Sequence, residues 1–496
     1  MSDARPLVSP PAIVVGGGIA GLGAARLLAR HYPDVLVLER DVRDEVHHVE
    51  DAFRSWERGG VPQFRHSHAF LARVRLTLLA HMPEVLDRLR LAGVREIALA
   101  DSVPPGMTLP PRPDDEDVVL LACRRATFEW ALRESVRARP GVELREGVHV
   151  AGFTTTRGPG ERPWISGVRL DDGTELAASI VVDALGRRSP TPAWLAAIGV
   201  TAPRERTFET GIFYYTRFYR VHRRDLAPQG TTGLIAGDFG WVKIAVFPGD
   251  HDTFSVTVGP PVEDKSLKRL AEPDQFERFI SAFPQIAPWR AAGVSEPIHG
   301  AETPVLVMGQ LRNRLRHFVD DGGPVAPGLF VIGDAAYHTN PIYGRGCPTA
   351  LAQAALLDEA IARHRADPIA AARHLHHSSE RELRPYWDAA VASDRRMRGN
   401  GPLDLTNPRA MLAAIATQAF GWFIDHGILP ATRADPVVFR GLLRVFHMLD
   451  APERLMADPT IVLRALPVLA RVLGGAPPPR AFEIVRREEA LARLAG

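Results

Sequence analysis

The chain has 496 residues, of which 46% are hydrophobic and 24% are charged, a composition typical of a globular protein with two or three domains. Its 60 basic and 58 acidic residues give a net charge of +2, so no broad positive field toward nucleic acid or anionic lipid is expected. The two cysteines, Cys123 and Cys347, are too few for a disulfide framework and lack metal-ligand spacing. These features exclude the nucleic-acid-binding, metal-cluster and disulfide-rich secreted classes.

The N-terminus predicts no targeting segment. The first ten residues, MSDARPLVSP, lack the charged and apolar regions of a secretion signal, and no uncharged apolar run reaches the roughly 18 residues that span a bilayer. We therefore expect a cytoplasmic protein without an integral membrane segment. One stretch is ambiguous, TIVLRALPVLARVLGG at 460–475: it could lie on a membrane, but its apolar residues run almost all round, which favours a buried helix.

The first predicted elements form a βαβ unit between Ala12 and Glu39. Residues 13–15 and 35–38 have the composition of short buried strands, and apolar residues between them recur at helical spacing. The intervening turn reads G-x-G-x-x-G, with glycines at Gly16, Gly18 and Gly21. In such a turn the first glycine permits the tight bend, the second lets the backbone approach a pyrophosphate, and the third lets helix and strand pack closely. Glu39 ends the second strand, where a carboxylate accepts hydrogen bonds from a ribose, so the unit predicts a dinucleotide site.

Loops, helices and short strands follow in order. GVPQFRHSHAF at 60–70 is a loop that carries His66 and His68, and the proline-rich, acidic 102–117 is an exposed connection. A strand at 118–122, a helix at 126–137 and short strands over 142–185 come next. From Thr210 the pattern predicts an antiparallel sheet in which Phe254, Val256 and Val258 pack on one face while the alternate residues face a cavity. The pattern beyond about 373 is helical.

Three separated motifs resemble the three signatures of the para-hydroxybenzoate hydroxylase-like FAD superfamily. These are the glycine motif at 16–21, VVDALGRRS at 181–189, and GDAAYHTNPIYGRG at 333–346. The superfamily includes flavin hydroxylases, epoxidases, halogenases and geranylgeranyl reductases, and the form of the second motif is closest to the epoxidase and halogenase branch. The resemblance implies an α/β fold of glutathione-reductase-like architecture, with a Rossmann-type FAD domain, an inserted antiparallel substrate domain and a helical C-terminal region.

The resemblance also implies boundaries and site residues. The FAD domain would comprise 1–100, 118–205 and 301–370, the substrate domain 206–300, and the helical region 371–496. The residues expected to bind FAD are Gly16, Gly18, Gly21, Glu39, Arg40, Arg125, Asp183, Gly186, Asp334, Pro341, Gly344 and Gly346. Those expected in catalysis are His66, which could exchange protons near neutral pH, and Tyr343 and Arg345 within the flavin loop.

The implied reaction is oxygen insertion into an apolar or aromatic small molecule through a flavin C4a-hydroperoxide, with O2 as co-substrate. Electrons would come from NAD(P)H or from a separate reductase partner. The aromatic side chains expected to build the pocket are Phe213, Tyr215, Phe218, Trp241 and Phe247. Halogenation is disfavoured, because no lysine precedes Lys243 and halogenases of this superfamily use a lysine in the early flavin domain. Two alternatives stay open: a reductase or dehydrogenase of isoprenoid or lipid carbon-carbon bonds, and a flavin-binding interaction protein without catalysis.

Overall fold

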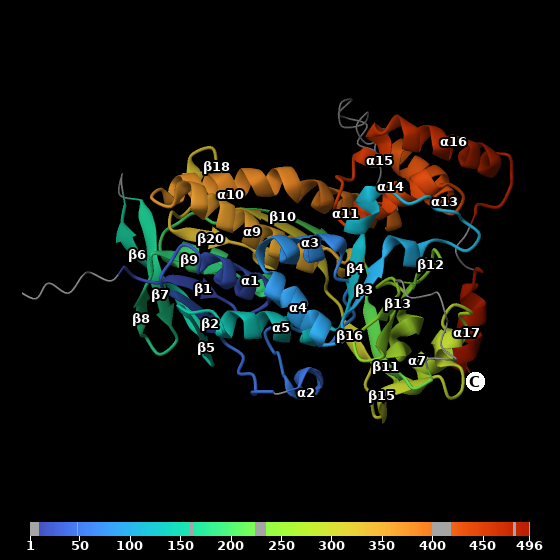
Figure 1. The fold of residues 1–496 in the computed structure, drawn as a ribbon, viewed down its shortest axis with the longest axis horizontal. Coiled ribbons are helices and arrows are strands. Elements are labelled where there is room, and N and C mark those ends of the chain that lie inside the picture. The colour runs from blue at the N-terminus through green and yellow to red at the C-terminus, as the bar shows by residue number, and fades with distance from the viewer. Residues whose placement is uncertain are drawn as a thin grey trace, which may run out of the picture.

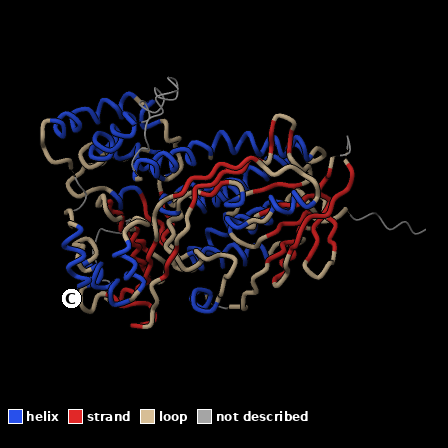
Figure 2. Tube along the Cα trace, turned by 180° about the vertical axis from the view of Figure 1, so that it is seen from behind, coloured by secondary structure: helices blue, strands red, loops and turns tan. Residues whose placement is uncertain are grey.

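The computed structural model describes residues 9–46, 48–158, 162–223, 235–398, 418–479 and 483–495. Figure 1 shows a parallel sheet with its helices toward one end, an antiparallel sheet toward the other end, and a group of helices above the antiparallel sheet. Figure 2 shows the same separation of the two strand-rich regions from behind. The Rossmann-type α/β class expected from the sequence is confirmed.

The parallel sheet has five strands in the order β20-β9-β1-β2-β5, and each strand is parallel to its neighbours. The strands are β20 (Leu329–Val331), β9 (Ile180–Asp183), β1 (Ala12–Val15), β2 (Val35–Glu39) and β5 (Val142–Glu146). The four strands other than β5 are buried along their whole length, which explains their continuous apolar runs. Segments from residues 12 to 331 therefore meet in one sheet, with β1 at its centre.

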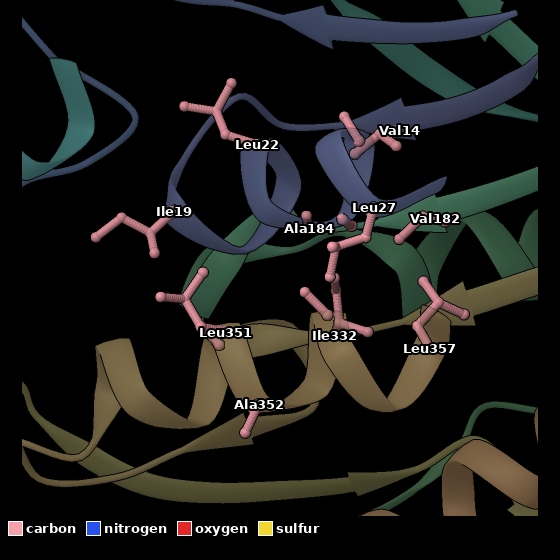
Figure 3. Packing of buried hydrophobic residues seen from close by; sticks show 14 of the residues in the cluster. Val14, Ile19, Leu22, Leu27, Val182, Ala184, Ile332, Leu351, Ala352 and Leu357 are labelled. Carbon is pink, nitrogen blue, oxygen red and sulfur yellow. The ribbon is translucent and has the colours of Figure 1, made fainter. Parts of the chain in front are cut away.

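Helix α1 (Ile19–Leu28) packs against β1 and β2 of this sheet. It also packs against α9 (Gly346–His364), and Figure 3 shows Leu27 and Leu351 from the two helices in one cluster with Val14 of the sheet. The contact is close, because a Cβ on Gly23 would lie 2.8 Å from the Leu351 side chain. The other helices of this domain are α2 (Val49–Ser55), α3 (Ala72–His81), α4 (Pro83–Leu91), α5 (Arg125–Arg137), α6 (Thr191–Ala197) and α10 (Pro368–Glu382).

Small antiparallel units extend the domain. They are β3–β4 (Arg95–Ala98, Val119–Ala122), β6–β7–β8 (Val150–Arg157, Pro163–Leu170, Glu175–Ala177), β18–β19 (Val319–Asp320, Gly323–Pro324) and β10–β17–β21 (Arg204–Glu209, Arg312–His317, Tyr337–His338). The last unit contains β21, which lies within the third motif (333–346), so this motif is anchored in a sheet.

The second large sheet has the order β12-β13-β14-β11-β15, and β16 also pairs with β11. Its strands are β11 (Tyr214–Val221), β12 (Ile235–Asp238), β13 (Lys243–Pro248), β14 (Thr253–Gly259), β15 (Ser295–Ala301) and β16 (Leu306–Met308). Val256 and Val258 pack with Phe276 and Phe279 of α7 (Pro273–Ile280). On the opposite face the hydroxyls of Ser255 and Thr257 bond to Ser67. The predicted alternation of apolar and polar residues is present, but the polar face packs on the loop at 60–70 instead of lining a cavity.

The C-terminal residues divide between two bodies. Helices α11 (Arg384–Met397), α13 (Leu429–Ala431), α14 (Pro436–Phe446), α15 (Arg454–Ala457) and α16 (Pro459–Leu473), with a π-helical turn at Ile424–Ile428, follow α10. Arg440 of α14 bonds to Asp115 through two nitrogens, at 2.6 and 2.9 Å, so the exposed connection expected at 102–117 is fixed by this region. Helix α17 (Arg487–Ala495) instead packs on α7, and Trp289 of α8 (Ala287–Arg290) belongs to the same apolar cluster. The antiparallel sheet thus runs to Met308 of β16, and α17 packs on the helix that covers its apolar face.

A buried ion pair joins the two large domains. Arg124, just before α5, bonds to Asp250 in the turn between β13 and β14, with Nη2 2.6 Å from Oδ2 and the backbone N 2.7 Å from Oδ1. Thr127 donates a further bond to the same carboxylate, and Glu50 also contacts the guanidinium. Burial opposes ionisation of Asp250, but His251 and Arg124 hold its pKa well below the usual range. The charge pair therefore fixes the sheet against the first domain.

We expect Arg124→Ala to lower the free energy of unfolding by about 3–5 kcal/mol, because it leaves a buried carboxylate without its main cation. Arg145→Ala is the matched control, since Arg145 and Glu143 form an exposed pair that contributes at most about 1 kcal/mol. Urea denaturation of both variants makes the comparison. Equal losses in the two variants would show that the Arg124–Asp250 pair does not hold the domains together.

Candidate functional site

A single cavity of about 400 Å³ runs between the parallel sheet and the antiparallel sheet. It is lined by the β1–α1 turn, the end of β2, the loop at 60–69, the turn after β9 and the segment from Asp334 to Ala350. The expected site residues that line it are Gly16, Gly18, Glu39, Arg40, His66, Arg125, Gly186, Asp334, Pro341, Gly344 and Gly346. Side chains from β13, β16 and α14 close the far part. All three sequence motifs therefore border one space.

The β1–α1 turn is shaped by its three glycines in different ways. Gly16 has φ +106°, and a Cβ there would lie 2.7 Å from the carbonyl oxygen of Ala184. Gly21 does not line the cavity; a Cβ there would lie 1.8 Å from the Gly16 oxygen, so this glycine allows α1 to approach the strand. A Cβ on Gly18 would meet no atom within 4 Å. The backbone at Gly18 therefore borders open space where an anion can approach the uncapped α1 N-terminus.

Glu39 lies at the end of β2 within a charged cluster. Its Oε2 accepts hydrogen bonds from the Gly17 backbone N at 2.8 Å and from Arg58 Nη2 at 3.0 Å. Arg58 also lines the cavity and donates to the buried Glu129 at 2.5 Å. Arg40 is half exposed at the edge of the cavity. Sequence reasoning missed Arg58, because nothing in the local pattern at 56–60 indicates that this arginine turns back to Glu39.

Arg125 begins α5 and contacts both Glu129 and His68. Its Nε lies 3.3 Å from Glu129 Oε2, and its Nη1 lies 3.4 Å from His68 Nε2. The other ring nitrogen of His68 lies 2.9 Å from the His66 carbonyl oxygen. Since Arg125 can only donate, His68 Nε2 accepts and Nδ1 carries the proton. The arrangement presents the positive Arg125 to the cavity and keeps His68 neutral.

His66 is buried between the cavity and the antiparallel sheet. Its Nδ1 lies 3.2 Å from Thr216 Oγ1, which contacts Thr257 Oγ1 at 2.9 Å, and Thr257 contacts Ser67 at 2.7 Å. Burial and the nearby Arg187 lower the pKa of His66 to about 4, and burial together with Arg125 lowers the pKa of His68 to about 3. Both rings are therefore neutral near pH 7. The hydroxyl chain fixes the position of His66.

The third motif forms a further part of the cavity wall. Asp334 lies 3.3 Å from His338 Nδ1; burial opposes its ionisation, but His338 and the more distant Arg125 lower its pKa overall. Gly346 begins α9, whose N-terminus has no side-chain cap, so its free N–H groups face the cavity. The buried Oε1 of Gln63, on the loop at 60–69, has no hydrogen-bond partner. This wall offers both donors and acceptors to a polar ligand.

Three expected site residues face away from the cavity. The carboxylate of Asp183 accepts from Leu185 N, Ser189 Oγ and Thr191 Oγ1 at 2.5–2.8 Å, and these bonds shape the turn after β9. The Tyr343 hydroxyl donates to Asp394 of α11 at 2.7 Å. The guanidinium of Arg345 lies over the rings of Tyr343 and Tyr386 and donates to the Tyr386 carbonyl oxygen at 2.6 Å. In the structure these three side chains support the loops that form the cavity.

The apolar part of the cavity differs from the expected aromatic set. Met308 of β16 and Ile342 of the third motif pack together, and Phe247 and Phe446 line the same space. Of the five aromatic residues expected in the pocket, only Phe247 lines it. The others pack elsewhere, because they belong to the cores of the sheet: Tyr215, Phe213 and Trp241 against the α7 side, and Phe218 against Phe53.

These features fit a flavin adenine dinucleotide. Two uncapped helix N-termini, an open glycine backbone and a carboxylate at the end of the second strand border one elongated space. Helix N-termini stabilise both phosphate charge and negative charge on a reduced flavin ring.

Substitutions at Gly21 and Gly18 distinguish the structural role of the first from the binding role of the second. We expect Gly21→Ala to destabilise the protein itself, because the new methyl overlaps the Gly16 oxygen. We expect Gly18→Val to leave the apoprotein's melting temperature unchanged and to weaken FAD binding by at least about tenfold, because the side chain enters the phosphate path. Melting of the apoprotein and flavin-fluorescence titration measure the two effects. Unchanged FAD affinity in Gly18→Val would place the phosphates elsewhere.

The two histidines predict a pH dependence of stability. Their folded pKa values lie below the ordinary value of about 6.5, so the unfolded chain binds more protons between about pH 4 and 6.5, and the free energy of unfolding falls as the pH falls through this window. Urea denaturation at pH 7.5 and pH 5 should show a smaller loss in His66→Gln/His68→Gln than in the wild type. His222→Gln, at an exposed histidine, is the control. An identical loss in the double variant would mean that neither ring is held neutral.

Comparison with known proteins agrees with this geometry. A family model described as an NAD(P)-binding Rossmann-like domain matches residues 14–43, which belong to the β1–α1–β2 unit and the residues after it. "Protein Rv3254" of Mycobacterium tuberculosis is 26% identical over 489 residues, covering 91% of this chain and 92% of that protein.

Two solved structures show how far the likeness extends. PqsL, a probable FAD-dependent monooxygenase from Pseudomonas aeruginosa, matches with a TM-score of 0.55 and 17% identity over 82% of this chain and 100% of its own. The flavin-dependent brominase Bmp2 matches with a TM-score of 0.53 and 18% identity over 78% of this chain and 91% of its own. This chain therefore shares the fold of these two flavin-dependent enzymes, as its three motifs predicted.

Proposed function

We propose that the protein is a FAD-dependent monooxygenase that inserts one atom of O2 into a small apolar or aromatic molecule. The observation that carries this proposal is the continuity of the cavity: one space is bordered by the dinucleotide-binding turn at one wall and by Met308, Ile342, Phe247 and Phe446 at another. A cofactor and an apolar substrate can therefore meet without crossing bulk water.

Residues of all three motifs would hold the cofactor. The turn at Gly16–Gly18 and the N-terminus of α1 would bind the pyrophosphate, and Glu39 with Arg58 would bind the adenosine ribose. Asp334 would bind hydroxyls of the flavin side chain, and the N-terminus of α9 would stabilise negative charge on the reduced ring. Bound flavin supplies the redox chemistry, since once reduced it reacts with O2.

The remaining side chains would position substrate and exclude water. The neutral His66 can accept or donate one hydrogen bond at Nε2, while Thr216 holds Nδ1. The apolar residues around Met308 would bind the substrate by contact rather than by charge. The electron donor is either NAD(P)H acting directly or a separate reductase. Reduction of the isolated protein by NAD(P)H distinguishes the first from the second.

The test uses purified flavin-loaded protein, reduced without air by NADH, NADPH or dithionite and then mixed with oxygen-18-labelled O2 and a panel of apolar and aromatic compounds. A product that contains labelled oxygen supports the monooxygenase. A saturated or desaturated product without label would instead assign a hydride-transfer reductase or dehydrogenase. FAD that no donor can reduce would assign a flavin-binding protein without catalysis.

A larger side chain in the apolar part of the cavity should impair substrate binding without changing the reduction of the flavin. We expect Met308→Trp to lower kcat/KM by about tenfold or more, because the larger ring occupies substrate space, while dithionite still reduces the flavin at the wild-type rate. Val307→Trp is the matched control, since the neighbouring Val307 on the same strand is exposed. Equal kcat/KM values in the two variants would contradict a substrate site at Met308.

A further inference from the structure

Exposed large apolar side chains are concentrated in the C-terminal part of the chain. Of the twelve such residues in the described part of the molecule, seven lie within 418–495. They are Phe420, Trp422, Leu429, Leu463, Leu466, Leu473 and Ile484. Single exposed apolar residues need no explanation, but a concentration in one region marks an interaction surface.

Helix α16 carries three of these residues on one stripe. Leu463, Leu466 and Leu473 are 64%, 43% and 65% exposed, and with Ala470 they recur at intervals of three or four residues, which is one face of a helix. The opposite face, formed by Ile461, Ala465, Val468 and Leu469, is buried. Figure 1 places α16 at the outer edge of the molecule, and the exposure of these leucines shows that their stripe faces away from the core.

The charges beside the stripe have one sign. Arg464 and Arg471, seven residues apart on an adjacent stripe, are exposed, and the chain has no acidic residue between Asp458 and Glu483. Arg464 contacts Asp435 at 3.4 Å but remains 58% exposed. The surface therefore combines apolar side chains with arginines that have no carboxylate on their own helix. The overall charge of +2 hides this local feature.

We propose that α16 docks on an anionic lipid surface, with its leucines in the boundary between headgroups and acyl chains and its arginines at the lipid phosphates. No helix in the described residues is long and apolar enough to cross a membrane, so α16 lies in the plane of the surface. A second copy of this chain is a poorer occupant, because a two-fold contact through α16 would place its arginines against a helix without carboxylates.

The docking surface is connected to the cavity by one pair of helices. Helix α14 packs against α16 and ends at Phe446, which lines the cavity. Docking would therefore bring a lipid phase close to the cavity. The interpretation of this cavity as a substrate site rests on the proposed function. Lipid binding itself does not rest on it and is measured without turnover.

The first experiment is co-sedimentation of the flavin-loaded full chain with vesicles of phosphatidylglycerol and phosphatidylcholine, and with vesicles of phosphatidylcholine alone. We expect binding to the anionic vesicles that weakens with salt. Arg464→Gln/Arg471→Gln should weaken it by about fivefold per arginine, and Leu463→Ser/Leu466→Ser should abolish it. The controls are Arg145→Gln and Leu91→Ser, which change exposed residues of β5 and α4. Absence of binding at low salt, or equal binding by stripe and control variants, overturns the proposal.

A labelled variant tests insertion directly and does not depend on loss of binding. Both native cysteines are buried, so an environment-sensitive fluorophore can be attached selectively to Leu466→Cys, with Leu91→Cys as control. A blue shift on addition of anionic vesicles at position 466 and not at 91 supports docking. A blue shift that rises with protein concentration without vesicles, together with a dimer by size-exclusion chromatography, would assign a second copy and overturn the lipid proposal.

Discussion

The structure depends on one close approach, between the N-terminus of α1 and the strand that precedes it. The distance is set by Gly21, where a methyl group would lie 1.8 Å from the Gly16 oxygen. This packing holds the first turn of α1 beside the ends of β1 and β9, so its free N–H groups face the cavity. The rest of the cavity wall is assembled around that turn, from segments as far along the chain as Phe446 of α14.

Charged side chains form ion pairs around this cavity, whereas the two histidines that line it are neutral. Behind Glu39 and Arg125, buried arginines and carboxylates pair with one another, and Arg124 and Asp250 join the domains. Inside, His66 and His68 are neutral because burial and nearby arginines disfavour their protonation. The net effect is a wall that offers positive charge and N–H donors toward a dinucleotide, next to an apolar space. This division of the cavity suits a charged cofactor and an uncharged substrate.

The sequence predicted the elements whose patterns are local. The strands around Val14 and Val37, the glycine turn and the alternation of Val256 and Ser255 all follow from residue spacing, and the structure has them within a residue or two. Order and spacing of three motifs also predicted the fold. Local pattern did not indicate which side chains within a motif reach the cavity. The carboxylate of Asp183 bonds within the turn after β9, and the polar atoms of Tyr343 and Arg345 bond to α11.

The sequence by itself thus determined the βαβ unit and the division into parallel and antiparallel sheets, because each depends on periodicity and on glycines within short stretches. The FAD-type fold was implied by the resemblance of three separated motifs to a known superfamily. Only the tertiary structure decided which residues meet: Arg58 with Glu39, Phe446 with the cavity, α17 with α7, and the exposed stripe of α16. The physical reason is that burial and ion pairing depend on contacts between segments tens to hundreds of residues apart. The sequence of α16 is apolar almost all round, so it does not indicate which face of the helix is buried. The neighbouring helices decide that.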